Sequence, residues 1–320
     1  MRSARSAFEL RDDARVRFEI DSDPSLFAAA ARPFLEARVE HNLLATVVTA
    51  VLAGRHRGTP PMLVRCLDDQ DRLTAVAIRT PPWPMLPSEL DGDGARALTA
   101  LWLDRDPACA GVTAPAATAR AIAAAWAQLT GVVTTCGRRT AMHSLQAVVD
   151  PPRRAPGRLR AARRRELGLL AEWWRAAVRE MNSPGHAAAE AEAMLSARLD
   201  DGCLWLWEDA VGEPVSMVGV NAAVAGVVRV GPVYTPPQQR RRGYAGAAVA
   251  AVSRRMLGGG AHTCALFTDL ANPTSNKIYA ELGYRRLSDW EEHLFSAPEP
   301  SGGPTPLPSG GATPAPEAHA

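Results

Sequence analysis

The sequence predicts an α/β protein with two domains. Its 320 residues exceed what one compact core usually holds, so the length favours two domains over one. Short apolar segments with strand character alternate with segments of helical periodicity, and this alternation is typical of α/β or α+β architecture. The 47% hydrophobic and 22% charged residues indicate a globular chain.

Composition removes several functional classes. The 36 Lys and Arg residues nearly balance 34 Asp and Glu residues, and the net charge of +2 argues against a nucleic-acid partner. No run of about 18 apolar residues occurs, so we expect no membrane partner. The five cysteines form no CxxC pair, which predicts neither a metal site nor a disulfide framework. The first residues mix Arg with acidic residues and lack an apolar signal segment, so we expect a cytoplasmic location.

Two breaks in composition divide the chain. Residues 297–320 are mostly Pro, Gly, Ser, Thr and Ala, and this composition predicts a disordered tail. Three prolines and a glycine within Asp150–Gly157 interrupt the pattern and predict a domain boundary. We therefore expect an N-terminal α/β domain over 1–150, a linker over 151–157 and a second domain over 158–296.

The first half combines helical and strand patterns. Helical periodicity begins near residue 24 and is followed by strands, two further helices and a last strand. The expected ranges are 24–52 (helical), 62–67 and 73–78 (strands), 94–103 and 116–129 (helices) and 140–149 (strand). No glycine loop of the phosphate-binding type occurs here, so the half is expected to be structural or to shape an acceptor site.

The second half has a sharper pattern. Its expected order is one strand, two helices, three strands, a helix, a strand, a helix and two strands. The expected strands are 158–163, 203–208, 214–222, 227–235, 264–270, 284–290 and 291–295. The expected helices are 166–181, 187–199, one that begins within 240–257 and ends at glycines 258–260, and 275–283.

The segment after the third of these three strands predicts an anion site. Pro236 and Pro237 cannot continue a strand ladder, and the chain turns into a helix at Arg240–Gly243. Such a turn directs unpaired N–H groups and the positive end of the helix dipole towards one point. Gly243 has no Cβ and admits a diphosphate, while Ala245 and Gly246 keep the first helical turn narrow. The arginines Arg240, Arg241 and Arg242 add charge and hydrogen-bond donors.

The spacing Arg240-x-x-Gly243-x-Ala245 resembles the acyl-CoA pyrophosphate loop of the GCN5-related N-acetyltransferases, the GNAT superfamily. A second segment, LFTDLANPTSNKIYAELGYRRL, is similar to the family signature N-x-x-(A/S)-x-x-x-Y-x-x-x-G-(F/Y). The matching residues are Asn272, Ser275, Tyr279, Gly283 and Tyr284. The order of elements also matches the family over residues 158–295. A dinucleotide-binding loop is poorly supported because G-x-G-x-x-G is absent.

The resemblance implies a mixed, mostly antiparallel sheet flanked by helices and an N-acetyltransferase that uses acetyl-CoA. In this family the acyl group passes to a primary amine by direct attack in a ternary complex. The implied general acid is Tyr279. Backbone groups of the strand are expected to contact the pantetheine arm of the cofactor and the oxyanion, and they belong to Val233, Tyr234 and Thr235. The expected pyrophosphate-loop residues are Arg240, Arg241, Arg242, Gly243, Tyr244, Ala245 and Gly246, and further cofactor contacts are expected from Asn272, Ser275 and Asn276.

Some assignments stay open. The general base is not assigned, and the side chains considered for it are Glu180, Glu208, Asp209, His262 and Asp269. The acceptor is a small-molecule or peptide amine that the sequence does not identify, and a homodimer is an open alternative. A non-catalytic acyl-CoA sensor is the alternative function.

The first half resembles the degenerate N-terminal copy of two-domain GNAT proteins. The sequence Thr-Pro-Pro occurs at both 80–82 and 235–237, which hints at internal duplication. No R-x-x-G-x-A follows Pro82, so this half is expected to bind CoA poorly.

Overall fold

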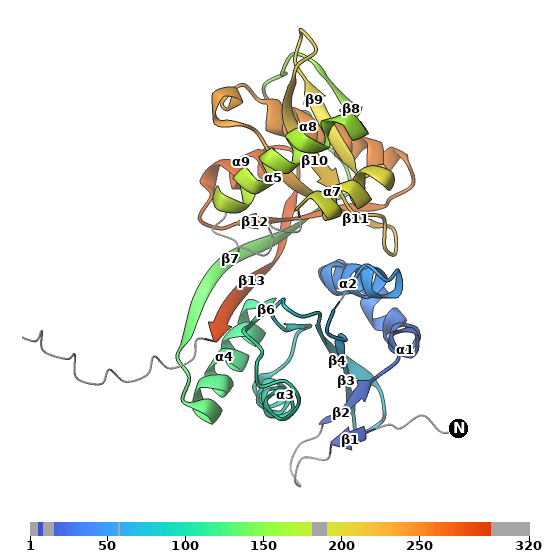
Figure 1. Ribbon diagram of the computed structural model, residues 1–320, viewed down its shortest axis with the longest axis vertical. Helices are drawn as coiled ribbons and strands as arrows, with labels where there is room; N and C mark the ends of the chain where they lie inside the picture. Colours follow the sequence, from blue (N-terminus) through green and yellow to red (C-terminus); the bar gives the residue numbers. More distant parts are fainter. Residues whose placement is uncertain (1–5, 9–15, 57, 181–190, 296–320) are drawn as a thin grey trace, which may run out of the picture.

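The computed structural model describes residues 6–8, 16–56, 58–180 and 191–295. It contains a five-stranded sheet in the first half and an eight-stranded sheet that extends through the second (Figure 1). The tail predicted for 297–320 and the beginning of the helix predicted for 187–199 lie outside the described residues. No described helix is both long enough and apolar enough to span a bilayer.

In the first half, two pairs of helices enclose the five-stranded sheet, whose order is β1-β2-β3-β4-β5. The elements are β1 (Ser6–Phe8), β2 (Val16–Asp21), α1 (Pro24–Glu36), η1 (Val39–His41), α2 (Asn42–Leu52), β3 (Met62–Asp68), β4 (Leu73–Arg79), β5 (Leu86–Pro87), α3 (Gly92–Arg105), β6 (Gly111–Pro115), α4 (Ala116–Thr130) and β7 (Thr134–Leu145). Helices α1 and α2 bury apolar side chains on one face of the sheet, and α3 and α4 do so on the other. The single helical pattern expected over 24–52 is thus two α-helices separated by a short 3₁₀ turn.

In the second half, helices again cover both faces of the sheet. The elements are β8 (Arg158–Ala161), η2 (Arg164–Glu166), α5 (Leu167–Glu180), α7 (Ala191–Asp200), β9 (Leu204–Glu208), β10 (Pro214–Val220), β11 (Val227–Tyr234), η3 (Pro237–Gln239), α8 (Tyr244–Gly258), β12 (Thr263–Asp269), α9 (Pro273–Glu281) and β13 (Arg285–Phe295). Helix α8 packs on one face, and α5 and α7 pack on the other. The expected order is confirmed, except that the last two strands form one continuous strand, β13.

The larger sheet joins the two halves of the chain. Its order is β6-β13-β7-β12-β11-β10-β9-β8. Strand β7 of the first half is inserted between β12 and β13 and is antiparallel to both. The far end of β13 then pairs with β6, so long strands connect the two halves (Figure 1). The division expected at 151–157 did not predict this exchange, because the pairing joins segments far apart in the sequence.

Counted from β2 in the first half and from β8 in the second, and leaving out the short 3₁₀ turns, both halves have the succession strand, two helices, three strands, helix, strand, helix, strand. Strand β10 of the second half therefore corresponds to β4, and β11 corresponds to β5. The Thr-Pro-Pro of 80–82 follows β4, whereas that of 235–237 follows β11. The duplication is present in the fold, but the two Thr-Pro-Pro sequences are not equivalent, and this detail of our expectation was wrong.

Strand β11 separates from β12 partway along its length. The two strands pair in parallel only from Val227 to Arg229 on β11, and Val230–Tyr234 have no partner on β12. On the other side, β10 stays paired with β11 through a bulge, because Val218–Val220 of β10 is opposite the longer span Val230–Val233. The sheet is thus open between β11 and β12 just before the chain reaches the predicted anion loop.

Candidate active site

The loop between β11 and α8 presents a set of backbone N–H groups for which the described part of the chain offers no acceptor. Arg241 and Gly243 have positive φ angles of 62° and 84°, which turn successive peptide groups towards the helix end. The first backbone bond into α8 runs from the N–H of Ala247 to the carbonyl of Gly243. For the N–H groups of 241–246, no acceptor is found among the described residues. This arrangement suits a diphosphate.

Glycine at position 243 is required by backbone conformation. A Cβ built there would lie 3.7 Å from the Cβ of Ala155, which is an ordinary contact. The positive φ is the constraint, because side chains with a Cβ rarely adopt it. The loop is also supported from the linker, since Nη1 of Arg153 donates to the carbonyl of Arg241 at 3.2 Å.

The three loop arginines divide into two kinds. Arg240 already has protein partners: its Nη2 lies 2.6 and 2.8 Å from the two carboxylate oxygens of Glu180, and its Nε donates to the carbonyl of Thr235 at 2.9 Å. Its own N–H donates to Pro237. Arg240 therefore joins α5 to the loop, and its expected contact with phosphate stays a prediction. The side chains of Arg241 and Arg242 are exposed and have no ion-pair partner among the described residues.

The start of α9 holds the three other polar residues expected at the cofactor. Asn272 caps the helix, and its Oδ1 accepts from the N–H of Ser275 at 3.1 Å. Nδ2 of Asn276 donates to the carbonyl of Asp269 at 3.2 Å, whereas its buried Oδ1 has no partner. The helix cap thus occupies Oδ1 of Asn272, whereas Oδ1 of Asn276 accepts no hydrogen bond from a described residue.

Tyr279 packs between α9 and the core beneath α8. Its ring lies 5.9 Å from that of Tyr284 in an edge contact, and Val233 of β11 borders the same core cluster. The Tyr284 hydroxyl is bound to Oγ of Ser253 at 2.8 Å, but no hydrogen bond joins the Tyr279 hydroxyl to a described residue. Burial raises the pKa of Tyr279 to about 12. The phenol therefore keeps its proton at neutral pH and is a suitable donor to a thiolate.

The five side chains considered as general base all contact protein groups. Two carboxylates are ion-paired with arginines, two accept N–H groups of their own turns, and the imidazole lies against a backbone carbonyl. The two ion-paired carboxylates are Glu180 and Glu208, and the two that accept from their own turns are Asp209 and Asp269. The imidazole is that of His262. The geometry favours none of them, and no base is assigned.

The corresponding loop of the first half has the opposite charge. Helix α3 follows β5 as α8 follows β11, but its cap is Asp91, whose Oδ1 accepts from the N–H of Gly94 at 2.7 Å. Asp93 adds a second carboxylate in the first turn. Carboxylates thus occupy the position where α8 offers free N–H groups and arginines, and they repel an anion. This supports the expectation that the first half binds CoA poorly.

One side-chain group not predicted from the sequence has the composition of a metal site. Ligand atoms of Cys136, Glu291 and His293, on the paired strands β7 and β13, lie within 4.8 Å of one another. The Glu291 carboxylate already contacts Arg120 at 2.7 Å and Arg139 at 3.3 Å. The hydrogen bond from Arg120 lowers the pKa of Glu291 to about 2. Because arginines already neutralise this carboxylate, we assign no metal to the group.

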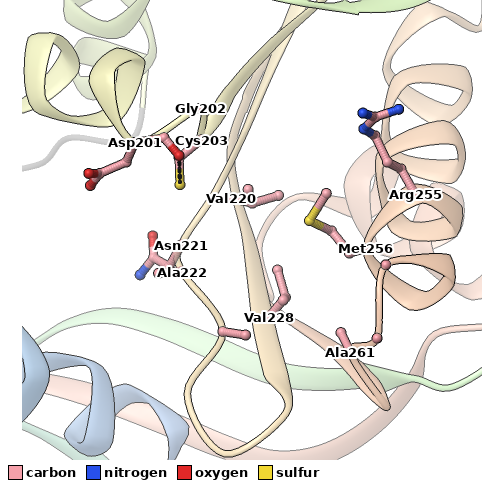
Figure 2. A pocket seen from close by; sticks show the side chains of 13 residues that line it. Asp201, Gly202, Cys203, Val220, Asn221, Ala222, Val228, Arg255, Met256 and Ala261 are labelled. Carbon is pink, nitrogen blue, oxygen red and sulfur yellow. Dashed lines mark hydrogen bonds between the residues drawn. The ribbon is translucent and has the colours of Figure 1, made fainter.

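A pocket of about 380 Å³ lies at the opposite end of α8 from the loop. Figure 2 shows Asn221 and Asp201 on one side of it and Arg255 and Met256 of α8 on the other. A helix of 15 residues is about 22 Å long, so this pocket is distinct from the anion loop. It plays no part in the site described above.

Comparison with known proteins identifies the family of the domain in the second half. Residues 169–284 match the model of the Acetyltransferase (GNAT) family. The sequence matches no curated protein. This match identifies a domain of the GCN5-related N-acetyltransferase type. The chain carries this GNAT domain in its C-terminal half, and the resemblance inferred from the two motifs is confirmed.

Solved structures extend the similarity to both halves. A Drosophila protein shares 14% identity at a TM-score of 0.61, with 88% of this chain and 98% of that chain covered. A GCN5-related N-acetyltransferase from Sphaerobacter thermophilus shares 17% at 0.55, with 87% and 95% covered. A tandem GNAT protein from the clavulanic acid biosynthesis pathway shares 12% at 0.53, with 90% and 100% covered. The TM-scores show a common fold, here the tandem GNAT architecture.

Proposed function

We propose that the protein transfers an acetyl group from acetyl-CoA to a primary amine by direct attack in a ternary complex. The observation that carries the proposal is the set of unpartnered N–H groups at 241–246, placed where β11 leaves β12. A loop that binds a diphosphate next to an opening in the sheet can hold both the nucleotide end and the extended arm of a CoA thioester. The GNAT domain match supports the same chemistry.

In this proposal the loop and strand β11 bind and orient the donor. The N–H groups of 241–246 accept the diphosphate, and the exposed Arg241 and Arg242 add positive charge. Residues 230–234 of β11 have no partner on β12, so the edge of β11 that faces β12 is open to the amide groups of the arm. An N–H near Val233 or Tyr234 would face the thioester carbonyl and stabilise the oxyanion formed on attack.

Tyr279 supplies the proton for the departing thiolate. The amine nitrogen forms its bond to the carbonyl carbon, the C–S bond breaks, and the phenolic proton of Tyr279 passes to sulfur. The phenol is protonated at neutral pH because its pKa lies well above 7, and the phenolate left after the transfer regains a proton from solvent. The amine loses its proton to solvent or to a base that the structure does not identify.

Acetyl-CoA titration and thiol release test this proposal together. We expect the full chain to bind acetyl-CoA by calorimetry and to release CoA when amines are supplied, and Tyr279→Phe to retain binding with slower release. Arg164→Met is a matched control, because Arg164 is an exposed partner of Asp200 outside the site. Binding without turnover on any amine would favour the sensor alternative, and absence of binding would overturn the proposal.

A further inference from the structure

An arginine on β11, Arg229, has one buried guanidinium nitrogen without a hydrogen-bond partner among the described residues. Nη1 of Arg229 is buried without a hydrogen bond, and no carboxylate of the described residues is ion-paired with this side chain. Part of the side chain still reaches solvent. Burying a guanidinium without an acceptor is costly, so such a group in a folded protein calls for an explanation.

A second arginine lies beside it. Nη1 of Arg198, on α7, donates to the carbonyl of Gly231 at 3.0 Å, and Nη2 donates to Oδ1 of Asn221 at 3.0 Å. Both acceptors are uncharged. The nearby carboxylate of Asp201 is paired with Arg55 at 3.1 Å. Burial, followed by the charge of Arg198, lowers the pKa of Arg229 to about 10.

The chain makes room for Arg198. A Cβ on Gly219 of β10 would lie 3.2 Å from Nη1 of Arg198 and 2.9 Å from Cδ of Pro232. Glycine at 219 therefore lets Arg198 reach across β10 to the carbonyl of Gly231. Arg198 is thus held in place by Gly231, Asn221 and the space that Gly219 leaves.

The pair also lies beside the opening that receives the thioester in the proposed reaction. Arg229 is the last residue of β11 that pairs with β12, and Arg198 contacts Gly231, two residues further on. Along a strand, side chains two residues apart share a face, so Arg229 is on the same face as Val227. Val227 packs in a cluster with Val39 and Leu43 of the first half. The arginines therefore lie between the open end of the sheet and the first half of the molecule.

We propose that Arg229, with Arg198 beside it, binds an anionic group of the acceptor, so that the acceptor is a primary amine that also carries a carboxylate or a phosphate. This inference rests on the proposed acetyl transfer. The planar guanidinium of Arg229 offers paired N–H donors of the geometry that a carboxylate or phosphate accepts. An anion bound there neutralises the charge that the protein leaves unpaired, and it places the amine of the same molecule towards the opening beside Gly231.

Paired amines test the inference through turnover. Glycine, L-lysine and phosphoethanolamine are compared with glycinamide, L-lysinamide and ethanolamine, which keep the amine and lose the anion. We expect the anionic member to be acetylated at least 10-fold more efficiently in kcat/KM in at least one pair. The two amino acids report on a carboxylate, and phosphoethanolamine reports on a phosphate.

Arg229→Met separates recognition from stability. We expect its KM for the preferred anionic amine to rise at least 10-fold with kcat changed less than twofold, acetyl-CoA affinity to be unchanged, and Arg229→Lys to recover part of the loss. The melting temperature should not fall, because an uncompensated buried charge has been removed. Arg164→Met is the control. A lower melting temperature with an unchanged KM would overturn the inference and show a structural role.

A binding measurement covers the case in which no amine of the panel is turned over. Melting of the CoA-loaded protein is followed with N-acetylglycine, N-acetylglycinamide and inorganic phosphate. We expect stabilisation by an anionic probe, none by the amide, and loss of the effect in Arg229→Met. Equal responses of wild type and variant would overturn the anion site. Loss of acetyl-CoA binding by the wild type would instead overturn the proposed function, so the two failures are distinguishable.

Discussion

At the scale of single residues, Tyr279 is expected to affect the chemical step and not binding. Tyr279→Phe removes the proposed proton donor and keeps the ring that packs against Tyr284. General acid catalysis contributes about 10²–10⁴-fold, so kcat should fall by about that factor while the acetyl-CoA dissociation constant changes less than twofold. Single-turnover kinetics with calorimetry measure both quantities. An unchanged kcat would assign the proton to another donor.

The raised pKa of Tyr279 also predicts a pH profile. Since burial shifts this pKa upward to about 12, the phenol stays protonated well above its ordinary value of 10.0. The kcat of the wild type should therefore show no loss attributable to Tyr279 between pH 8 and about 10.5. A kcat that falls with an apparent pKa near 10, in a limb absent from Tyr279→Phe, would contradict the raised pKa of this hydroxyl.

Gly243 tests the loop conformation. Gly243→Ala forces a Cβ into a left-handed conformation that costs about 1–2 kcal/mol, and the loop should respond by turning its N–H groups away from the ligand. We expect acetyl-CoA affinity to fall about 10-fold or more, with a smaller change in melting temperature. Gly258→Ala, near the far end of α8 with open space around its Cβ position, is the matched control. Equal effects of the two variants would count against the loop as the diphosphate site.

At the scale of elements, Glu291 connects α4, β7 and β13 through Arg120 and Arg139. Its pKa is lowered in the folded chain to about 2 by Arg120, from an ordinary 4.5. The stabilisation is therefore complete above pH 4.5 and is lost as the pH falls towards 2. We expect Glu291→Gln to lower the unfolding free energy at pH 7 by about 1–3 kcal/mol. Denaturant unfolding of wild type and variant should converge in acid, and a constant difference across that range would contradict this account.

The elements also show what a sequence can predict. The loop at 240–246 and the segment around Tyr279 were predictable because their chemistry depends on residues close together in the chain. The insertion of β7 between β12 and β13 was not, because strand pairing is non-local and carries no local signal. The unpaired Arg229 was also missed, since the absence of a partner appears only once the chain is folded.

At the scale of the whole molecule, the shared sheet predicts that the second half does not fold alone. A chain of residues 151–320 lacks β7, which leaves β12 and β13 with unpaired edges inside the sheet. We expect it to aggregate and to bind no acetyl-CoA. A chain of residues 132–320 restores β7 and is expected to be more soluble. Circular dichroism and size-exclusion chromatography measure this difference, and a monomeric, cooperatively unfolding 151–320 chain would contradict the role of β7.

The two halves of the molecule differ in charge at their equivalent helix ends, and this difference leads to the most direct test. A crystal structure of the full chain with acetyl-CoA should show one donor per chain, with its diphosphate oxygens about 2.7–3.2 Å from N–H groups of 241–246 and its arm between β11 and β12. The thioester sulfur of acetyl-CoA should lie next to the Tyr279 side chain. A diphosphate bound at the start of α3, or at the pocket near Arg255, would contradict the account.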